Sequence, residues 1–128
     1  REFYLHILNS LSPGDVIKEY VGAINFEKFM PAEFEKFYPE ERVRRKISIK
    51  TIATRSGESE KWAQSSQKYL RELKLVNNSE SFSSNMQIYK NGVGLISYKD
   101  YFMGVIVESK DISNMLKSAF ELMWGATA

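Results

Sequence analysis

Side chains that could do catalytic chemistry are few in this sequence, and they are scattered. The single histidine, His6, lies in a helical pattern beside Phe3 and Ile7, and its neighbours suggest no partner that would orient it as a general base. The glutamates between residues 33 and 41 fit solvated helix faces better than an acid–base pair. We therefore interpret His6 as a structural residue and predict no catalytic residues.

A basic cluster spans residues 42–46 (RVRRK), with Lys50 and Arg55 beyond it. Cations at the end of a helix interact favourably with its dipole, so a solvated helix end is one interpretation. A site for phosphate or another anion is the alternative. A base-reading nucleic-acid interface is not indicated, because these residues include no helix-turn-helix, finger or stacking platform.

Composition limits the classes of protein further. The chain has 128 residues, 43% of them hydrophobic and 27% charged, which is typical of one folded domain. The absence of cysteine excludes disulfides and thiolate sites and favours a reducing compartment, so we predict a cytoplasmic protein. A net charge of +2 does not by itself indicate a nucleic-acid or membrane partner. No phosphate-loop, zinc or calcium motif is present, and we predict neither cofactor nor metal.

Hydrophobic periodicity indicates alternating helices and strands in the first half of the chain. A helix over residues 3–11 should stop at Pro13 and Gly14, and period-2 patterns predict strands over 15–22 and 46–54. Between them lies an aromatic helical arm, residues 25–46, which Pro31 and Pro39 should break. A helix over 56–74, with Ser56 or Ser59 as its cap, should lead into a short third strand at 73–76.

The second half predicts a hairpin-like cluster and a closing helix. Three short apolar strands fit residues 86–111, with a tight turn at Asn91-Gly92 that would use positive φ. The closing helix should have Ser109 as its N-cap and Gly125 just past its end. The expected fold class is therefore α/β, with a mixed, partly parallel sheet flanked by helices.

Candidate ligand-binding residues follow from the expected strand ends. Open α/β sheets bind ligands beside the carboxyl ends of their strands, where we expect Tyr20, Thr54 and Arg55. Ser97 and Lys99, after the hairpin, are weaker candidates. Ordinary surface or core roles remain open for each of the five.

The hairpin sequence SNMQIYKNGVGLIS resembles the strand-turn-strand of the phospholipase D superfamily, whose signature is His-x-Lys-x-x-x-x-Asp. The resemblance places Ser84, Met86 and Asn91 at the histidine, lysine and aspartate positions. None of the three supplies the family's nucleophilic chemistry. The resemblance thus implies a phospholipase D-like fold whose catalytic signature is lost.

A second resemblance covers nearly the whole chain. The order of SPGDVIKEYVG, ERVRRKISIKTIAT, IYKNGVGLISYKD and GVIVESKDIS…FELMW is similar to the effector domain of TrmB-like transcriptional regulators. It implies one sensor domain over residues 1–128, a homodimer, and a small-molecule effector that is a sugar or an anionic metabolite. DNA would be bound through an N-terminal winged helix-turn-helix outside this chain, which begins as if within a helix.

Two other functions stay open at this point. The domain could be a purely structural dimerisation module, joined through the aromatic arm or the final helix. It could also be a phosphodiesterase with a rearranged site, in which Ser84 takes part. We expect no membrane partner, because no apolar run approaches the roughly 18 residues that a spanning helix needs.

Overall fold

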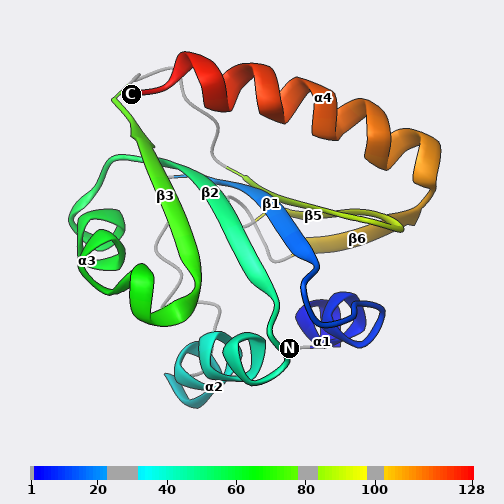
Figure 1. Cartoon of the computed structure of the whole chain (residues 1–128), viewed down its shortest axis with the longest axis horizontal. Coiled ribbons are helices and arrows are strands. Elements are labelled where there is room, and N and C mark those ends of the chain that lie inside the picture. The colour runs from blue at the N-terminus through cyan, green and yellow to red at the C-terminus, as the bar shows by residue number, and fades with distance from the viewer. Residues whose placement is uncertain (1, 23–31, 78–83, 98–102) are drawn as a thin grey trace.

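A computed structural model describes residues 2–22, 32–77, 84–97 and 103–128 (Figure 1). Its helices are α1 (Glu2–Asn9), α2 (Ala32–Arg44), α3 (Gly57–Ser65), the 3-10 helix η2 (Gln67–Tyr69) and α4 (Lys110–Ala126). Its strands are β1 (Val16–Val21), β2 (Ser48–Thr54), β3 (Arg71–Val76), β4 (Asn85–Tyr89), β5 (Gly92–Ser97) and β6 (Met103–Glu108).

The six strands form one sheet in the order β3-β2-β1-β4-β5-β6. The pairs β1–β2 and β2–β3 are parallel, whereas β1–β4, β4–β5 and β5–β6 are antiparallel. Helices connect the parallel strands, as such crossovers require, and a two-residue turn joins β4 to β5. The prediction of an α/β fold with a mixed, helix-flanked sheet is confirmed.

Helices cover both faces of the sheet. On one face, residues of α1 and α2 pack on the strands around a core that includes Ile7, Phe34 and Ile49. On the other face α4 crosses the strands, with Phe120 fully buried against Ile52 and Ile88. Figure 1 shows α4 running from the β6 side of the sheet to the end of β3, where the C-terminus lies.

The chain enters β2 through a left-handed residue that is not glycine. Lys46 has a φ of 59°, the N–H of Ile47 donates to the carbonyl of Arg42 (2.9 Å), and the N–H of Lys46 donates to that of Val43 (3.0 Å). This pair of bonds is a Schellman motif, which satisfies carbonyls at the end of α2. Lysine in place of the usual glycine explains why the sequence gives no stop signal there.

The same motif precedes β3. Leu70 has a φ of 55°, the N–H of Arg71 donates to the carbonyl of Ser66 (2.9 Å), and the N–H of Leu70 donates to that of Gln67 (3.3 Å). The strand therefore starts at Arg71, earlier than the predicted start at Leu73, and the predicted helix over 56–74 is too long. The cap at the start of α3 is as expected, because the Ser56 hydroxyl accepts from the N–H of Ser59 (3.1 Å).

Two predicted helix breaks are wrong. Pro39 lies inside α2, where burial of Phe34, Tyr38 and Arg42 at i, i+4 and i+8 outweighs the cost of about 3 kcal/mol for an interior proline. Gly125 lies inside α4, because the helix continues to Ala126. The part of the aromatic arm before Ala32, including Pro31, lies outside the described residues. Ser109 is the N-cap of α4, as predicted: its hydroxyl accepts from the N–H of Ile112 (3.2 Å).

The hairpin turn differs from the prediction. Tyr89 pairs with Gly92, so the turn residues are Lys90 and Asn91. Within the described ranges positive φ occurs only at Gly14, Lys46 and Leu70, and Asn91-Gly92 does not use it. Glycine is needed at position 92 for another reason: a Cβ there would collide with the backbone carbonyl oxygen of Val107 on β6.

Candidate functional site

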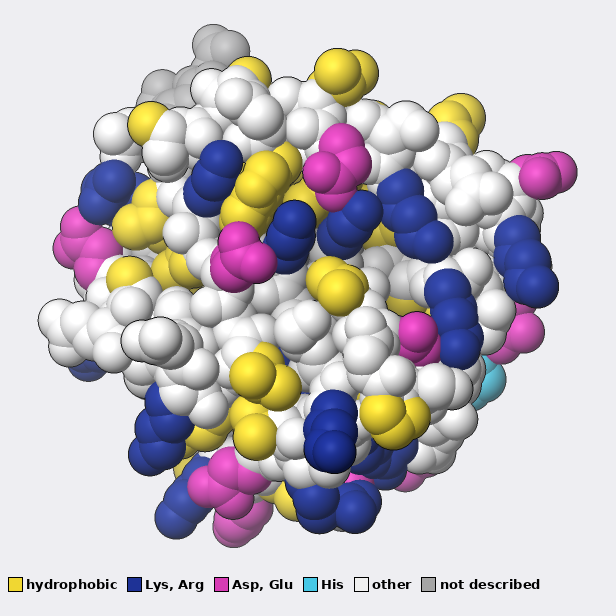
Figure 2. Space-filling view, viewed as in Figure 1, with side chains coloured by type: hydrophobic (Ala, Val, Ile, Leu, Met, Phe, Trp, Pro, Cys, Tyr) yellow, Lys and Arg dark blue, Asp and Glu magenta, His cyan; other side chains and the backbone are white. Residues whose placement is uncertain are grey.

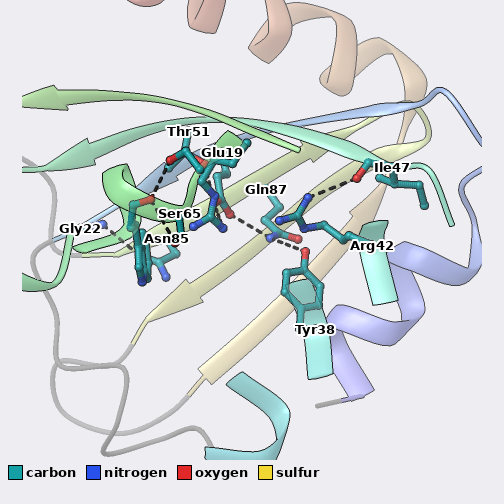
Figure 3. Close-up of polar contacts among 12 residues, drawn as sticks. Glu19, Gly22, Tyr38, Arg42, Ile47, Thr51, Ser65, Asn85 and Gln87 are labelled. Carbon is teal, nitrogen blue, oxygen red and sulfur yellow. Dashed lines mark hydrogen bonds and ion pairs between the residues drawn. The ribbon is translucent and has the colours of Figure 1, made fainter. Parts of the chain in front are cut away.

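A row of polar side chains lies under the helices α2 and α3, in the middle of the sheet. Glu19 of β1 is in register with Thr51 of β2 and with Gln87 of β4, so the three lie side by side on one face (Figure 3). Each is at most 6% exposed. Buried polar groups at the centre of a sheet are costly unless they are hydrogen-bonded, which makes this row the first candidate for a functional site.

The Glu19 carboxylate is well satisfied. It accepts hydrogen bonds from Thr51 Oγ1 (2.8 Å) and Gln87 Nε2 (3.0 Å), one on each of its oxygens. Arg71 of β3 places Nη2 3.6 Å from Glu19 Oε1, and its guanidinium lies 4.8 Å from the ring centroid of Trp62 in α3. Glu19 and Arg71 therefore form a largely buried ion pair that neighbouring donors and an aromatic face support.

Helix α2 contributes Tyr38 and Arg42, one turn apart. Gln87 Nε2 donates to the Tyr38 hydroxyl (3.1 Å), and the Arg42 guanidinium lies 5.7 Å from the centroid of the Tyr38 ring. Burial raises the pKa of Tyr38 to about 12, so the phenol is neutral at physiological pH. Burial also lowers the pKa of Arg42, yet arginine stays protonated in proteins.

Several buried donors and acceptors of this cluster have no partner among the described residues. They are Nε and Nη2 of Arg42, Nε of Arg71 and Oε1 of Gln87. Arg42 is 0% exposed, and its one hydrogen bond to the described residues runs from Nη1 to the carbonyl of Ile47 (3.2 Å). We call Glu19, Tyr38, Arg42, Thr51, Arg71 and Gln87 the buried polar cluster. Its unsatisfied groups are mostly hydrogen-bond donors, and burial of such groups without partners is costly.

The described residues offer no metal site. No three His, Cys, Asp or Glu side chains gather there so as to hold an ion. None of the described helices is long and apolar enough to cross a membrane.

His6 has a partner that the sequence did not indicate. Its Nε2 lies 2.7 Å from Glu108 Oε1 at the end of β6, with both side chains more than half exposed. Beside it, residues of α1 and β6, including Phe3, Asn9 and Gly104, line an open depression. The pair joins α1 to the edge strand at the surface, where ion pairs stabilise a protein by about 0–1 kcal/mol.

The predicted ligand residues near the ends of β1 and β2 do not join the buried polar cluster. Tyr20 lies on the opposite face, with its ring 5.3 Å from that of Phe120. Arg55 is exposed and donates to Asn77 Oδ1 (2.5 Å) and Glu60 Oε1 (2.9 Å). Thr54, half-buried at the end of β2, has interaction partners of its own. A ligand role for these residues stays a prediction.

The remaining predicted positions lie near the hairpin. Ser97 is half-buried at the end of β5, and Lys99 lies outside the described residues. Of the three positions that match the phospholipase D signature, Ser84 is exposed just before β4, Met86 packs in the core under α4, and Asn91 is in the turn. They are thus spread along the whole of β4 and do not converge on one point.

The sequence analysis did not single out the buried polar cluster, although part of it left a signal. Glu19 and Thr51 fall in phase with the buried residues Ile17 and Ile49 of their strands, where a polar residue is unexpected. Arg42 left no such signal. It belongs to the basic run that we interpreted as a solvated helix end, yet it is fully buried, and that interpretation is wrong for this residue.

Comparison with known proteins identifies a solved structure with a similar fold. No family model matches the sequence, and no curated protein is significantly similar to it. The fold is similar to the solved structure of TrmBL2, which is described as an archaeal chromatin protein with a novel mode of DNA binding. The TM-score is 0.58 at 15% identity, over 93% of this chain and 43% of TrmBL2. The chain therefore spans less than half the length of that relative.

Proposed function

We propose that this chain is the non-catalytic effector-sensing domain of a TrmB-like transcriptional regulator, with a phospholipase D-like fold that has lost its signature. The observation that carries the proposal is the buried polar cluster, in which three arginine N–H groups, Nε and Nη2 of Arg42 and Nε of Arg71, have no partner among the described residues. The TrmB-like resemblance of the sequence and the shared fold with TrmBL2 support the class.

Sensing requires a ligand that distinguishes two arrangements of the domain. The buried polar cluster joins side chains of α2 to the strands β1, β2, β3 and β4. A ligand bound between helix and sheet would favour the arrangement in which Arg42 and Gln87 face each other. The shift toward that arrangement would then change the contacts with a second subunit or with a DNA-binding domain.

A catalytic role has little support in the positions of the candidate residues. Ser84 precedes β4, whereas the His6–Glu108 pair lies next to Gly92, beyond the other end of that strand. Five strand residues separate the two positions by about 16 Å. A histidine at this distance cannot activate the Ser84 hydroxyl, since a general base needs hydrogen-bond contact.

DNA would be bound by a separate N-terminal winged helix-turn-helix. Figure 2 shows Lys and Arg side chains interspersed with acidic and apolar side chains over the strands. Lys18, for example, is paired with Glu121. This mixture is unlike the single-sign surface that phosphate backbones favour.

Dimerisation is the second candidate function, and exposed apolar side chains favour it. Met115 and Leu122 of α4 are 64% and 78% exposed, and Leu95 and Val105 of the β5–β6 pair are also exposed. We call Leu95, Met103, Val105, Ile112, Met115 and Leu122 the apolar surface. Leu95 and Val105 are opposite each other on neighbouring strands, and contiguous exposed apolar side chains are typical of protein–protein contacts.

The sensing proposal is tested by thermal unfolding of the chain with sugars, nucleotides and phosphorylated metabolites at millimolar concentration. A ligand at a hundred times its dissociation constant stabilises the folded state by about 2.7 kcal/mol, and we expect one class to raise the melting temperature by several degrees. Heat-unfolded chain in a titration calorimeter is the control for binding to the unfolded state. Stabilisation by none of the classes would refute sensing and leave the dimerisation module as the function.

A further inference from the structure

Arg42 is a buried cation without a counter-ion among the described residues. Glu19, the carboxylate of the buried polar cluster, is paired with Arg71. Glu41, the residue next to Arg42, instead accepts hydrogen bonds from the exposed side of α2, from Arg44 and Arg45. With two arginines and one glutamate, the buried polar cluster has one positive charge in excess.

An unpaired buried charge is expensive, and arginine cannot avoid the cost. A buried lysine or carboxyl group can shift its pKa and become neutral, whereas a guanidinium remains charged. Arg42 also has five N–H donors and, among the described residues, one hydrogen-bond acceptor, the carbonyl of Ile47. A partner that supplies both a negative charge and hydrogen-bond acceptors would offset both deficits.

The two unpartnered nitrogens of Arg42 form one recognition edge. Nε–H and the N–H of Nη2 that lies beside it point in the same direction, and this edge matches the two oxygens of a carboxylate or phosphate. The bond from Nη1 to Ile47 holds the guanidinium by its other nitrogen. Figure 3 shows the Arg42 head group directed toward Gln87 and Tyr38.

We propose that the effector of this domain carries an oxyanion group, a carboxylate or a phosphate, which docks bidentately on Nε and Nη2 of Arg42. This inference rests on the proposed sensing function and names the chemical class of its ligand. Tyr38 is the second contact: its oxygen accepts from Gln87, and its own O–H, which has no acceptor among the described residues, would donate to the anion.

The cluster favours an oxyanion over an uncharged sugar for a simple reason. Hydroxyl groups could accept from Arg42, but they would leave its charge uncompensated in a region that water scarcely reaches. A single negative charge would make the cluster neutral. Glu19 does not compete as the partner, because Thr51, Gln87 and Arg71 already occupy its oxygens.

The test measures the response of the chain to inorganic phosphate, to acetate and to chloride at matched ionic strength. We expect phosphate or acetate, but not chloride, to raise the melting temperature with saturation, and whichever anion does so identifies the source of the oxyanion. In Arg42→Lys, which keeps the charge but loses the planar edge, we expect at least ten-fold weaker binding. Arg44→Met, an exposed change two residues further along α2, should bind as tightly as the unchanged chain.

A second measurement does not depend on the folding of a variant. In the unchanged chain labelled with 15N-arginine, phosphate or acetate should shift the Nε–H resonance of a slowly exchanging, buried arginine. No shift beyond that given by chloride, or equal affinity in Arg42→Lys, would overturn the oxyanion site. Stabilisation by an uncharged sugar alone would also overturn it while keeping the sensor, and stabilisation by no compound would refute both.

Discussion

Glycine is needed at position 92 because a neighbouring strand lies too close for a side chain, and not because of the φ angle of the residue. It starts β5 opposite Glu108, where β6 passes so close that an added methyl group would meet the carbonyl oxygen of Val107. The obstacle is backbone, which cannot turn aside as a flexible side chain can. A larger residue at this position would therefore force β5 and β6 apart, which destabilises the sheet.

We expect Gly92→Ala to destabilise the chain by about 1–3 kcal/mol, because strands β5 and β6 must separate to admit the methyl group. Urea denaturation measures the difference. Gly125→Ala is the matched control: the added Cβ meets nothing within 4 Å, and in a helix alanine is favoured over glycine by up to about 1 kcal/mol. Equal stability of Gly92→Ala and the unchanged chain would contradict the steric explanation.

At the scale of elements, the C-terminal end of α4 is bonded to the edge strand β3. Lys74 of β3 donates from Nζ to the carbonyl of Trp124 (2.8 Å) and lies 4.6 Å from the centroid of the Trp124 ring. Lys50 of β2 lies 5.4 Å from the same centroid. Lys74 thus donates to a carbonyl at the end of the helix, interacts favourably with the negative end of the helix dipole and packs on an aromatic ring.

Removal of this cation should loosen the end of the helix. We expect Lys74→Met to lower the free energy of unfolding by about 1 kcal/mol, the net contribution of one hydrogen bond. Hydrogen exchange should accelerate most in the last two turns of α4. Lys61→Met, at an exposed position on α3, is the control and should leave both measurements unchanged. A uniform acceleration along α4 would argue against a local fastening.

The elements differ in how much of them could be predicted. Strands β1 and β2 were predicted closely, because an alternating pattern is local. The end of the helical segment before β3 was not, because Leu70 occupies a position where glycine is the usual signal. The buried polar cluster was harder still: Glu19 and Gln87 are 68 residues apart and meet only through the pairing of β1 with β4.

At the scale of the whole molecule, the two faces of the sheet differ in character. One face carries the buried polar cluster, and the other carries α4 and the apolar surface. Figure 2 shows apolar side chains protruding along the edge where Figure 1 places α4. Strand β1 belongs to both faces, since it contributes Glu19 to the first and Tyr20 to the second.

We expect the chain to dimerise through the apolar surface, and light scattering at increasing concentration measures its molar mass. Met115→Lys should shift the chain toward a monomer, because it places a charge on the apolar surface. Gln64→Lys, at an exposed position of α3 on the other face of the sheet, should leave the molar mass unchanged. A monomer at high concentration for the unchanged chain, or a dimer that tolerates Met115→Lys, would exclude this surface as the interface.

The two residues with left-handed backbone angles before β2 and β3 are positions at which substitution should raise the thermal stability of the chain. Lys46 and Leu70 each hold a conformation that glycine adopts without penalty, and an L-residue held there costs of the order of 1 kcal/mol. Both are exposed and neither belongs to the buried polar cluster. Lys46→Gly and Leu70→Gly are therefore substitutions that would stabilise the domain without changing the buried polar cluster.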